Sequence, residues 1–241
     1  MYKKRQKLLR YHQTSVAKIF EKENQLIAQL QANELEQCLL LWQANEPTLV
    51  LPAGNKWPES EPLRAALTTQ NAHANWQLLS RKTGGAPVPQ CPGVINLSHL
   101  YVWPENQAYS VKLAYENLCS VLTLFFAKFG LDSQTHATEF SYCDGDYNIN
   151  LHGKKIVGTA QRVIIKKGGG KIVLAQAFIL IDVLLAELIK PVNLCYEFCG
   201  VSDRVKAEVH TALFENINER PSIEVLFQSI TQAFIDSGLY S

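Results

Sequence analysis

The feature that most constrains the fold of this chain is a pair of β-rich segments joined by a glycine-rich turn. The segments run from Ile156 to Ile165 and from Lys171 to Ile181, and the turn between them, 166–171, contains three consecutive glycines. Two such runs around a short turn are typical of a β-hairpin. Upstream, apolar and polar residues alternate from Tyr147 onwards, which indicates a further strand. The stretch 138–181 is therefore predicted to contain only strands and turns.

The rest of the chain predicts helices and strands in mixed order. Apolar spacing predicts a helix from Ser15 to Gln31 with Ser15 as its cap, and a buried helix from Ser110 to Phe129 that ends at Gly130. Further helices are expected at 61–69, 204–216 and 222–237, and further strands at 38–42, 48–51, 76–80 and 94–102. Because no repeat or linker interrupts this order, the chain is interpreted as one mixed α+β domain, 1–190, with a helical C-terminal extension, 191–241.

Composition excludes several classes of function. The 241 residues carry 23 Lys+Arg against 22 Asp+Glu, a net charge of +1. Nucleic-acid and membrane-surface binders depend on many cationic contacts, so neither kind of partner is expected. No apolar run reaches the ~18 residues that span a bilayer, and the polar residues after the basic N-terminus are unlike a secretory signal.

The cysteines point to an intracellular protein without a zinc site. Six cysteines are present, at positions 38, 91, 119, 143, 195 and 199, and none forms a Cys-x-x-Cys pair or lies beside clustered histidines. Structural zinc sites depend on such spacings. Without an export signal, the thiols are expected to be reduced, in a cytoplasmic protein with no bound metal.

Three motifs together resemble a known enzyme family. They are Arg81-Lys-Thr-Gly-Gly-Ala-Pro-Val-Pro-Gln90, Cys143-Asp-Gly-Asp-Tyr-Asn148 and Gly153-Lys-Lys-Ile-Val-Gly-Thr-Ala-Gln-Arg162. Their order and spacing resemble the biotin/lipoate A/B protein ligase family, in the branch of lipoate–protein ligases and cysteine-dependent octanoyltransferases. The resemblance implies a mixed, largely antiparallel sheet flanked by helices, like the catalytic domains of class II aminoacyl-tRNA synthetases and biotin ligases.

The resemblance also implies an activity and partners. An octanoyl or lipoyl group would be attached to a lysine of a lipoyl domain of a 2-oxoacid dehydrogenase or of the glycine cleavage H protein. Acyl carrier protein is a further possible partner. An acyltransferase would need no cofactor, whereas a ligase would use ATP and Mg.

Site residues follow from the motifs. Gly84 and Gly85 lack Cβ atoms, so they allow backbone to approach the acyl tail closely and permit positive φ. Lys155 matches the family's substrate-binding lysine, whose ammonium group can polarise a carbonyl; its neighbour Lys154 is expected to face solvent. The further substrate-binding residues that the resemblance implies are Arg81, Thr83, Ala86, Gly158, Thr159, Ala160, Gln161, Gln176 and Ala177.

Cys143 decides between mechanisms. In the cysteine-dependent octanoyltransferases a cysteine shortly before the Gly-x-Lys strand accepts the acyl group as a thioester, and Cys143 lies ten residues before Gly153. A thiolate is both a good nucleophile and a good leaving group. Three readings follow: an acyltransferase that works through Cys143, an ATP-dependent lipoate–protein ligase that works through lipoyl-adenylate, and a degenerate module that only binds. A partly buried structural cysteine is the alternative for Cys143 itself.

The sequence departs from the family pattern in places. Ala86 stands where the ligases have a third glycine, and Gln176, Ala177 and Phe178 stand where the family has His-Gly-Ser or His-Gly-Thr. Phe178 is therefore expected to shorten or redirect the tail channel. Val173 occupies the place of the nucleophilic cysteine of the other octanoyltransferase type, which argues against that mechanism.

Overall fold

A seven-stranded sheet forms the centre of the structure, a computed structural model that describes residues 5–69 and 75–239. The order across the sheet is β1-β2-β6-β10-β9-β8-β7, in which β1 and β2 are parallel and all other pairs are antiparallel. The predicted hairpin supplies the two strands β9 and β10 near the middle. The bounds are β1 Gln6–Thr14, β2 Gln37–Ala44, β6 Val94–Val102, β7 Gln134–Thr135, β8 Ile149–Leu151, β9 Lys154–Ile165 and β10 Lys171–Leu180.

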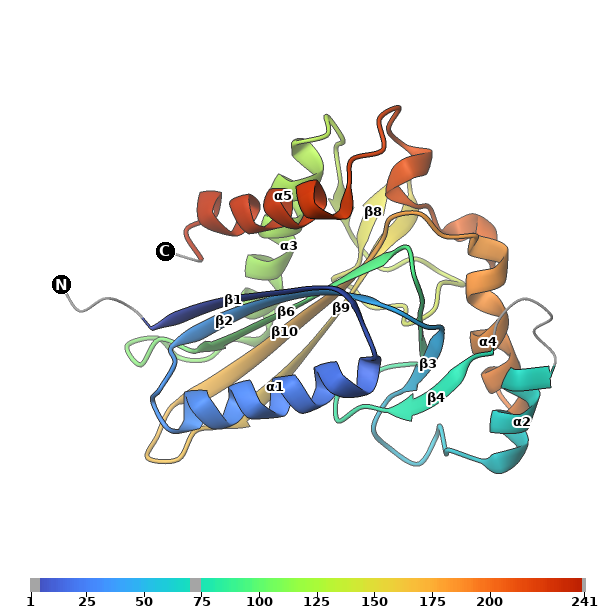
Figure 1. Ribbon diagram of the computed structural model, residues 1–241, viewed down its shortest axis with the longest axis horizontal. Helices are drawn as coiled ribbons and strands as arrows, with labels where there is room; N and C mark the ends of the chain where they lie inside the picture. Colours follow the sequence, from blue (N-terminus) through green and yellow to red (C-terminus); the bar gives the residue numbers. More distant parts are fainter. Residues whose placement is uncertain (1–4, 70–74, 240–241) are drawn as a thin grey trace.

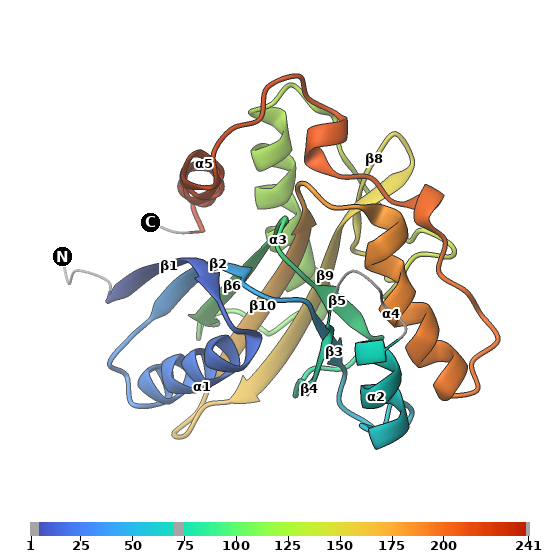
Figure 2. The ribbon, with the colours of Figure 1, turned by 45° about the vertical axis from the view of Figure 1, so that its right-hand side comes forward.

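Helices cover both faces of this sheet (Figures 1 and 2). The helix α1 (Val16–Gln31) lies on one face, while α3 (Val111–Ala127) and α5 (Ile223–Asp236) pack together on the other. Because both faces are covered, alternate residues of β2 are buried in two separate apolar clusters: Leu39 and Leu41 in one, Leu40 and Trp42 in the other. This alternation follows from the two-residue period of a strand.

A smaller sheet continues the structure at one end. Its order is β4-β3-β5, with bounds Gln77–Ser80, Thr48–Leu51 and Val88–Gln90. Helices α2 (Glu61–Thr69) and α4 (Leu185–Phe198) pack against each other beside it (Figure 2). The loop between β4 and β5 carries the first motif, so the small sheet holds that motif at the edge of the large one.

Most predicted elements are confirmed, including the mixed α+β class and the largely antiparallel sheet. The Ser15 hydroxyl accepts a hydrogen bond from the Lys18 amide at the start of α1, and Ser110 caps α3 in the same way. Strand β1 and helix α4, which continues through Pro191, were not predicted. None of the helices in the described part of the chain is both long and apolar enough to cross a membrane. All six cysteines are free thiols.

The helix predicted at 204–216 is wrong. Two isolated 3-10 turns, Ala207–Val209 and Leu213–Glu215, lie there instead. The backbone of this segment bonds to neighbouring parts of the fold rather than to itself: the Lys206 amide donates to the Phe140 carbonyl and the Thr211 amide to the Lys155 carbonyl. Tertiary hydrogen bonds therefore replace the i to i−4 bonds that a helix needs.

Candidate active site

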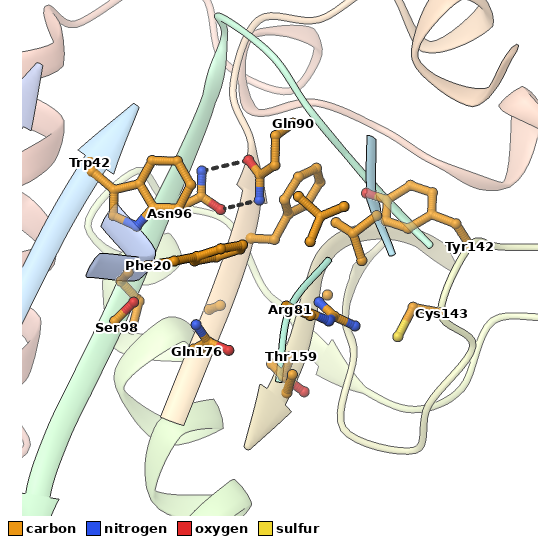
Figure 3. A pocket seen from close by; sticks show the side chains of 17 residues that line it. Phe20, Trp42, Arg81, Gln90, Asn96, Ser98, Tyr142, Cys143, Thr159 and Gln176 are labelled. Atoms are coloured by element: carbon orange, nitrogen blue, oxygen red, sulfur yellow. Dashed lines mark hydrogen bonds between the residues drawn. The ribbon is translucent and has the colours of Figure 1, made fainter. Parts of the chain in front are cut away.

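A pocket lies where α1, the large sheet and the first-motif loop meet (Figure 3). It contains about 560 Å³ of space that no protein atom fills and that partly opens to solvent. Cys143 and Tyr142 lie at one end of the view, and Trp42 and Ser98 at the other. The remaining lining is Phe20, Val50, Arg81, Val88, Gln90, Asn96, Leu97, Gly158, Thr159, Ala160, Gln176, Ala177 and Phe178.

Cys143 lies in the wall of this pocket on residues 138–148, here called the Cys143 loop. It is half-buried and has a φ of 50°, a left-handed conformation that side chains rarely adopt. The loop is fixed by its own polar side chains: the Asp144 carboxylate accepts from the Thr138 amide at 2.6 Å, and Asn148 donates to the Cys143 carbonyl at 3.0 Å. The loop thus holds the thiol at a defined place in the pocket wall despite the unfavourable backbone angle.

Gly85 is the glycine of the first motif that the geometry requires. Its φ is 111°, and a Cβ atom placed there would lie 3.1 Å from Nη2 of Arg81 and 3.2 Å from Sγ of Cys143. A side chain at this position would therefore crowd the thiol. The positive φ expected for Gly84 is not observed, and a Cβ atom there would meet no protein atom within 4 Å.

Arg81 joins the first motif to the Cys143 loop. Its Nη2 donates to the Gly84 carbonyl at 2.9 Å and to the Ala86 carbonyl at 3.3 Å, so Ala86 takes part through its backbone. Burial lowers the pKa of Arg81, while an electrostatic attraction and a side-chain hydrogen bond to Cys143 act in the opposite direction. A negative charge on the Cys143 sulfur would thus have a cationic partner beside it.

Lys155 is fully buried, and Lys154 is exposed as predicted. The Lys155 ammonium donates to the backbone carbonyl of Tyr142 and, at 2.9 Å, to that of Cys143, and it lies 4.5 Å from the centre of the Tyr142 ring. Burial lowers its pKa to about 8, against the attraction of Cys143 and Asp144. Lys155 does not line the pocket, and its ammonium group contacts the Cys143 loop that does.

Residues of β9 and β10 supply one wall. Five residues that the sequence predicts to bind substrate line the pocket: Gly158, Thr159, Ala160, Gln176 and Ala177. The Thr159 hydroxyl donates to the carbonyl of Tyr147 at 2.7 Å, so β9 also supports the Cys143 loop.

Five residues predicted to bind substrate do not line this pocket: Thr83, Gly84, Gly85, Ala86 and Gln161. Gln161 points away from the pocket and donates to the Tyr109 hydroxyl and the Val111 carbonyl, both at 3.1 Å. Thr83 borders the neighbouring pocket beside Arg162, and its buried hydroxyl has no hydrogen-bond partner. Phe178 narrows the main pocket from β10, where it meets the Tyr142 ring edge-on at 5.6 Å.

Several residues of the site were not found from the sequence. The clearest is Glu23 of α1, whose buried carboxylate accepts from Ser98 at 2.6 Å and from Gln176 at 2.8 Å. Burial raises its pKa. A signal existed, since Glu23 occupies the buried stripe of α1 between Ile19 and Leu26, where a carboxylate is rarely found without a partner. Phe20, Trp42 and Tyr142 carry no such signal.

Among residues 5–69 and 75–239, no cluster of three or more His, Cys, Asp or Glu side chains could hold a metal ion. His136 and His152 do not line the pocket, and His152 is exposed. A half-buried cysteine in the wall of a partly apolar pocket, beside the buried Lys155 ammonium and the partly buried Arg81 guanidinium, has the surroundings of a thiol nucleophile.

Sequence comparison places the chain near acyl-transferring enzymes. The family model described as the lipoyl protein ligase A/B catalytic domain matches residues 15–235. The chain is 32% identical over 89 residues to an octanoyl-[GcvH]:protein N-octanoyltransferase of Macrococcus caseolyticus, covering 37% of this chain and 31% of the relative. It is 27% identical over 158 residues to a lipoyl-[GcvH]:protein N-lipoyltransferase of Listeria monocytogenes, covering 64% and 52%. The chain thus spans about half or less of the length of these curated relatives.

Solved structures share the fold. A lipoate-protein ligase A bound with ATP superposes with a TM-score of 0.73 at 14% identity, covering 98% of this chain and 86% of that one. A bi-partite lipoate protein ligase from Thermoplasma acidophilum superposes with a TM-score of 0.63, also at 14% identity, covering 99% and 85%. At this identity the likeness establishes the architecture alone.

Proposed function

Because the chain belongs to the lipoyl protein ligase A/B catalytic domain family, we propose that it transfers an octanoyl or lipoyl group to a lysine of a lipoyl-type carrier domain through a thioester at Cys143. The observation that carries the proposal is the position of Cys143. Its sulfur lies in the pocket wall against Gly85 and Arg81, and its carbonyl is held by Lys155. The names of the relatives, octanoyl and lipoyl transferases that act on GcvH and other proteins, support the same reaction.

The reaction has two balanced steps. The Cys143 thiolate attacks the carbonyl carbon of an acyl thioester, so a new carbon–sulfur bond forms and the donor leaves as a thiolate. The ε-amine of the carrier lysine then attacks the Cys143 thioester, an amide forms, Cys143 leaves as a thiolate and the amine proton passes to solvent. Arg81 and Lys155 stabilise the negative sulfur in both steps by their charge. Neither step consumes ATP.

Lipoyl domains and the glycine cleavage H protein are the proposed acceptors, and an acyl thioester of the H protein or of acyl carrier protein is the proposed donor. The acyl tail lies in the pocket between Phe20, Gln176 and Phe178, with its carbonyl beside Cys143. The proposed location of the enzyme is the cytoplasm, because its nucleophile is a free thiol and thiols stay reduced there.

Intact mass spectrometry tests the proposal directly. The purified chain is incubated with octanoyl-GcvH without ATP, and peptide mapping locates the adduct. We expect an octanoyl group on Cys143, its loss in Cys143→Ser, and its retention in Cys91→Ser, a partly buried thiol that does not line the pocket.

The ligase reading predicts the opposite pattern: no adduct without ATP, and pyrophosphate release that depends on lipoate and survives in Cys143→Ser. That result would replace the transferase mechanism. Failure of both assays, with octanoate or lipoate still bound, would favour the degenerate binding module.

A further inference from the structure

Part of the chain beyond the predicted catalytic domain packs directly on the Cys143 loop. In this segment, residues 205–216, the Lys206 amide donates to the Phe140 carbonyl at 3.0 Å, and the Lys206 ammonium lies 3.8 Å from the centre of the Phe140 ring. The Thr211 amide donates to the Lys155 carbonyl at 2.9 Å. The segment is therefore bonded both to the Cys143 loop and to the strand that carries Lys155.

His210 occupies the centre of this contact. It is buried, and its ring lies parallel to that of Tyr142, with 4.8 Å between centroids and 6° between planes. The same Tyr142 ring lies against the Lys155 ammonium, and the Tyr142 carbonyl accepts a hydrogen bond from it. Removing His210 would consequently remove the packing that fixes the residue next to Cys143.

The hydrogen bonds of His210 define its protonation. Its Nδ1 lies 2.8 Å from the Lys206 carbonyl, an acceptor, so Nδ1 carries the proton, and the buried Nε2 has no partner. Burial lowers the pKa of His210 to about 4, and the nearby Lys155 charge acts in the same direction. The ring is thus neutral at pH 7 and adds no positive charge beside Lys155.

We propose that His210 is a positioning residue for the Cys143 nucleophile: its ring holds Tyr142 against Lys155, and the paired carbonyls of Tyr142 and Cys143 then fix the sulfur in the pocket wall. This inference rests on the proposed function. His210 does not line the pocket, so it acts through Tyr142 and Lys155 and not on the acyl group. Small displacements of a reacting atom slow a reaction strongly, by about 100-fold for 1 Å.

Two substitutions at position 210 test the proposal in the full chain. His210→Ala removes the stacked ring and is expected to slow acylation of Cys143 by octanoyl-GcvH about 100-fold, with little change in KM. His210→Phe keeps an aromatic ring on Tyr142 and is expected to retain most of the rate. His99→Ala is the matched control, because His99 is also buried and stacked on a tyrosine, Tyr101, at 4.5 Å, but lies outside the pocket.

The pKa of Lys155 gives a second readout that simple destabilisation would not move. The titratable groups that face Lys155 are Tyr142, Cys143 and Asp144 of the loop and His210 of the C-terminal segment. Lysine-ε ¹³C NMR, assigned with Lys155→Met, should show a midpoint near 8 in the unmodified chain. In His210→Ala, admission of water should raise this midpoint towards the ordinary lysine value, whereas His210→Phe should leave it unchanged.

The outcomes separate this inference from the proposed function. Full acylation and an unchanged Lys155 midpoint in folded His210→Ala would overturn it, as would equal losses in His210→Ala and His210→Phe. Absence of any Cys143 adduct in the unmodified chain would instead reject the transferase mechanism. The Lys155 titration would then still decide whether His210 controls the surroundings of that lysine.

Discussion

The ammonium nitrogen of Lys155 lies 2.9 Å from the carbonyl oxygen of Cys143, so the buried lysine holds the backbone of the candidate nucleophile. Strand β9 and the Cys143 loop bring the two residues together. Among residues 5–69 and 75–239, no carboxylate forms a salt bridge with Lys155. Main-chain oxygens thus stabilise this cation in place of a carboxylate. Its charge remains available to a thiolate on the same residue that it anchors.

The first prediction concerns the pH dependence of stability that Lys155 causes. The pKa of Lys155 is about 8 in the folded protein, against 10.5 for an ordinary lysine side chain, the value taken for the unfolded chain. Between these pH values the unfolded chain therefore binds more protons than the folded protein. Stability should therefore rise with pH across this window, by up to about 3 kcal/mol from this one group. Urea unfolding at pH 7.5 and at higher pH should show the rise in the unmodified chain, compared with Lys155→Met.

Lys155→Met isolates the contribution because every other titrating group is retained. If the two proteins change equally with pH, the folded pKa of Lys155 is not lowered, and burial of this ammonium group does not carry the cost assigned to it. Lys154→Met is the control, because that neighbouring lysine is exposed and should leave the pH dependence unaltered.

The second prediction compares adjacent glycines. Gly85→Ala places a side chain at a φ of 111° and within 3.2 Å of the Cys143 sulfur. The left-handed backbone costs about 1–2 kcal/mol, and the displaced thiol should react more than about tenfold more slowly with octanoyl-GcvH. Gly84→Ala meets nothing within 4 Å and should change stability by less than about 0.5 kcal/mol.

Thermal unfolding and the acylation rate would be measured side by side for both glycine variants. Equal behaviour of Gly84→Ala and Gly85→Ala would contradict the assignment of the close approach to Gly85 alone.

Local patterns in the sequence were sufficient for most of the fold. Alternation and a glycine turn define β9 and β10, and a capping serine with a helical apolar stripe defines α1, because these signals depend on neighbouring residues. The helix prediction for segment 205–216 was wrong because its structure depends on distant residues. Its backbone bonds to Phe140 and Lys155, which lie more than fifty residues away along the chain, and no local pattern reports such partners.

The candidate site shows the same contrast between what local motifs predict and what depends on distant residues. The motifs predict one site for Arg81, Cys143 and Lys155, and the structure brings Arg81 and Lys155 beside Cys143. The sequence could not show that Lys155 faces the carbonyls of the Cys143 loop instead of the pocket, nor that Gln161 turns away towards Tyr109. Such orientations depend on the register between strands and on loop geometry, which the motif leaves open.

The third prediction concerns Glu23, whose carboxyl group is buried among Ser98 and Gln176. Burial raises its pKa above 4.5, so as pH rises from 4.5 the unfolded chain loses the proton first and stability falls. Glu23→Gln keeps the shape and an acceptor oxygen but does not titrate. The variant should therefore gain stability relative to the unmodified chain between pH 4 and pH 7 in urea unfolding. A stability difference that is the same at both pH values would show that Glu23 keeps its ordinary pKa when buried.

The last prediction concerns the length of the acyl chain. Phe178 lines the pocket and meets Tyr142 edge-on, so its ring occupies space that a tail would otherwise enter. Phe178→Ala should destabilise the protein by about 3–5 kcal/mol, as large-to-small changes in a core do, and should move the preferred substrate to a longer chain. One methylene group in an apolar pocket changes selectivity by about tenfold or more, so competition among hexanoyl, octanoyl and decanoyl thioesters should reveal the change.

Phe125→Ala separates this effect from loss of stability. Phe125 is buried in α3, at a place that does not line the pocket, and its truncation should cost a similar free energy. Its ranking of the three thioesters should match that of the unmodified chain. An unchanged ranking in Phe178→Ala would mean that the tail takes a different path, through the Trp42 and Ser98 end of the pocket without passing the ring of Phe178.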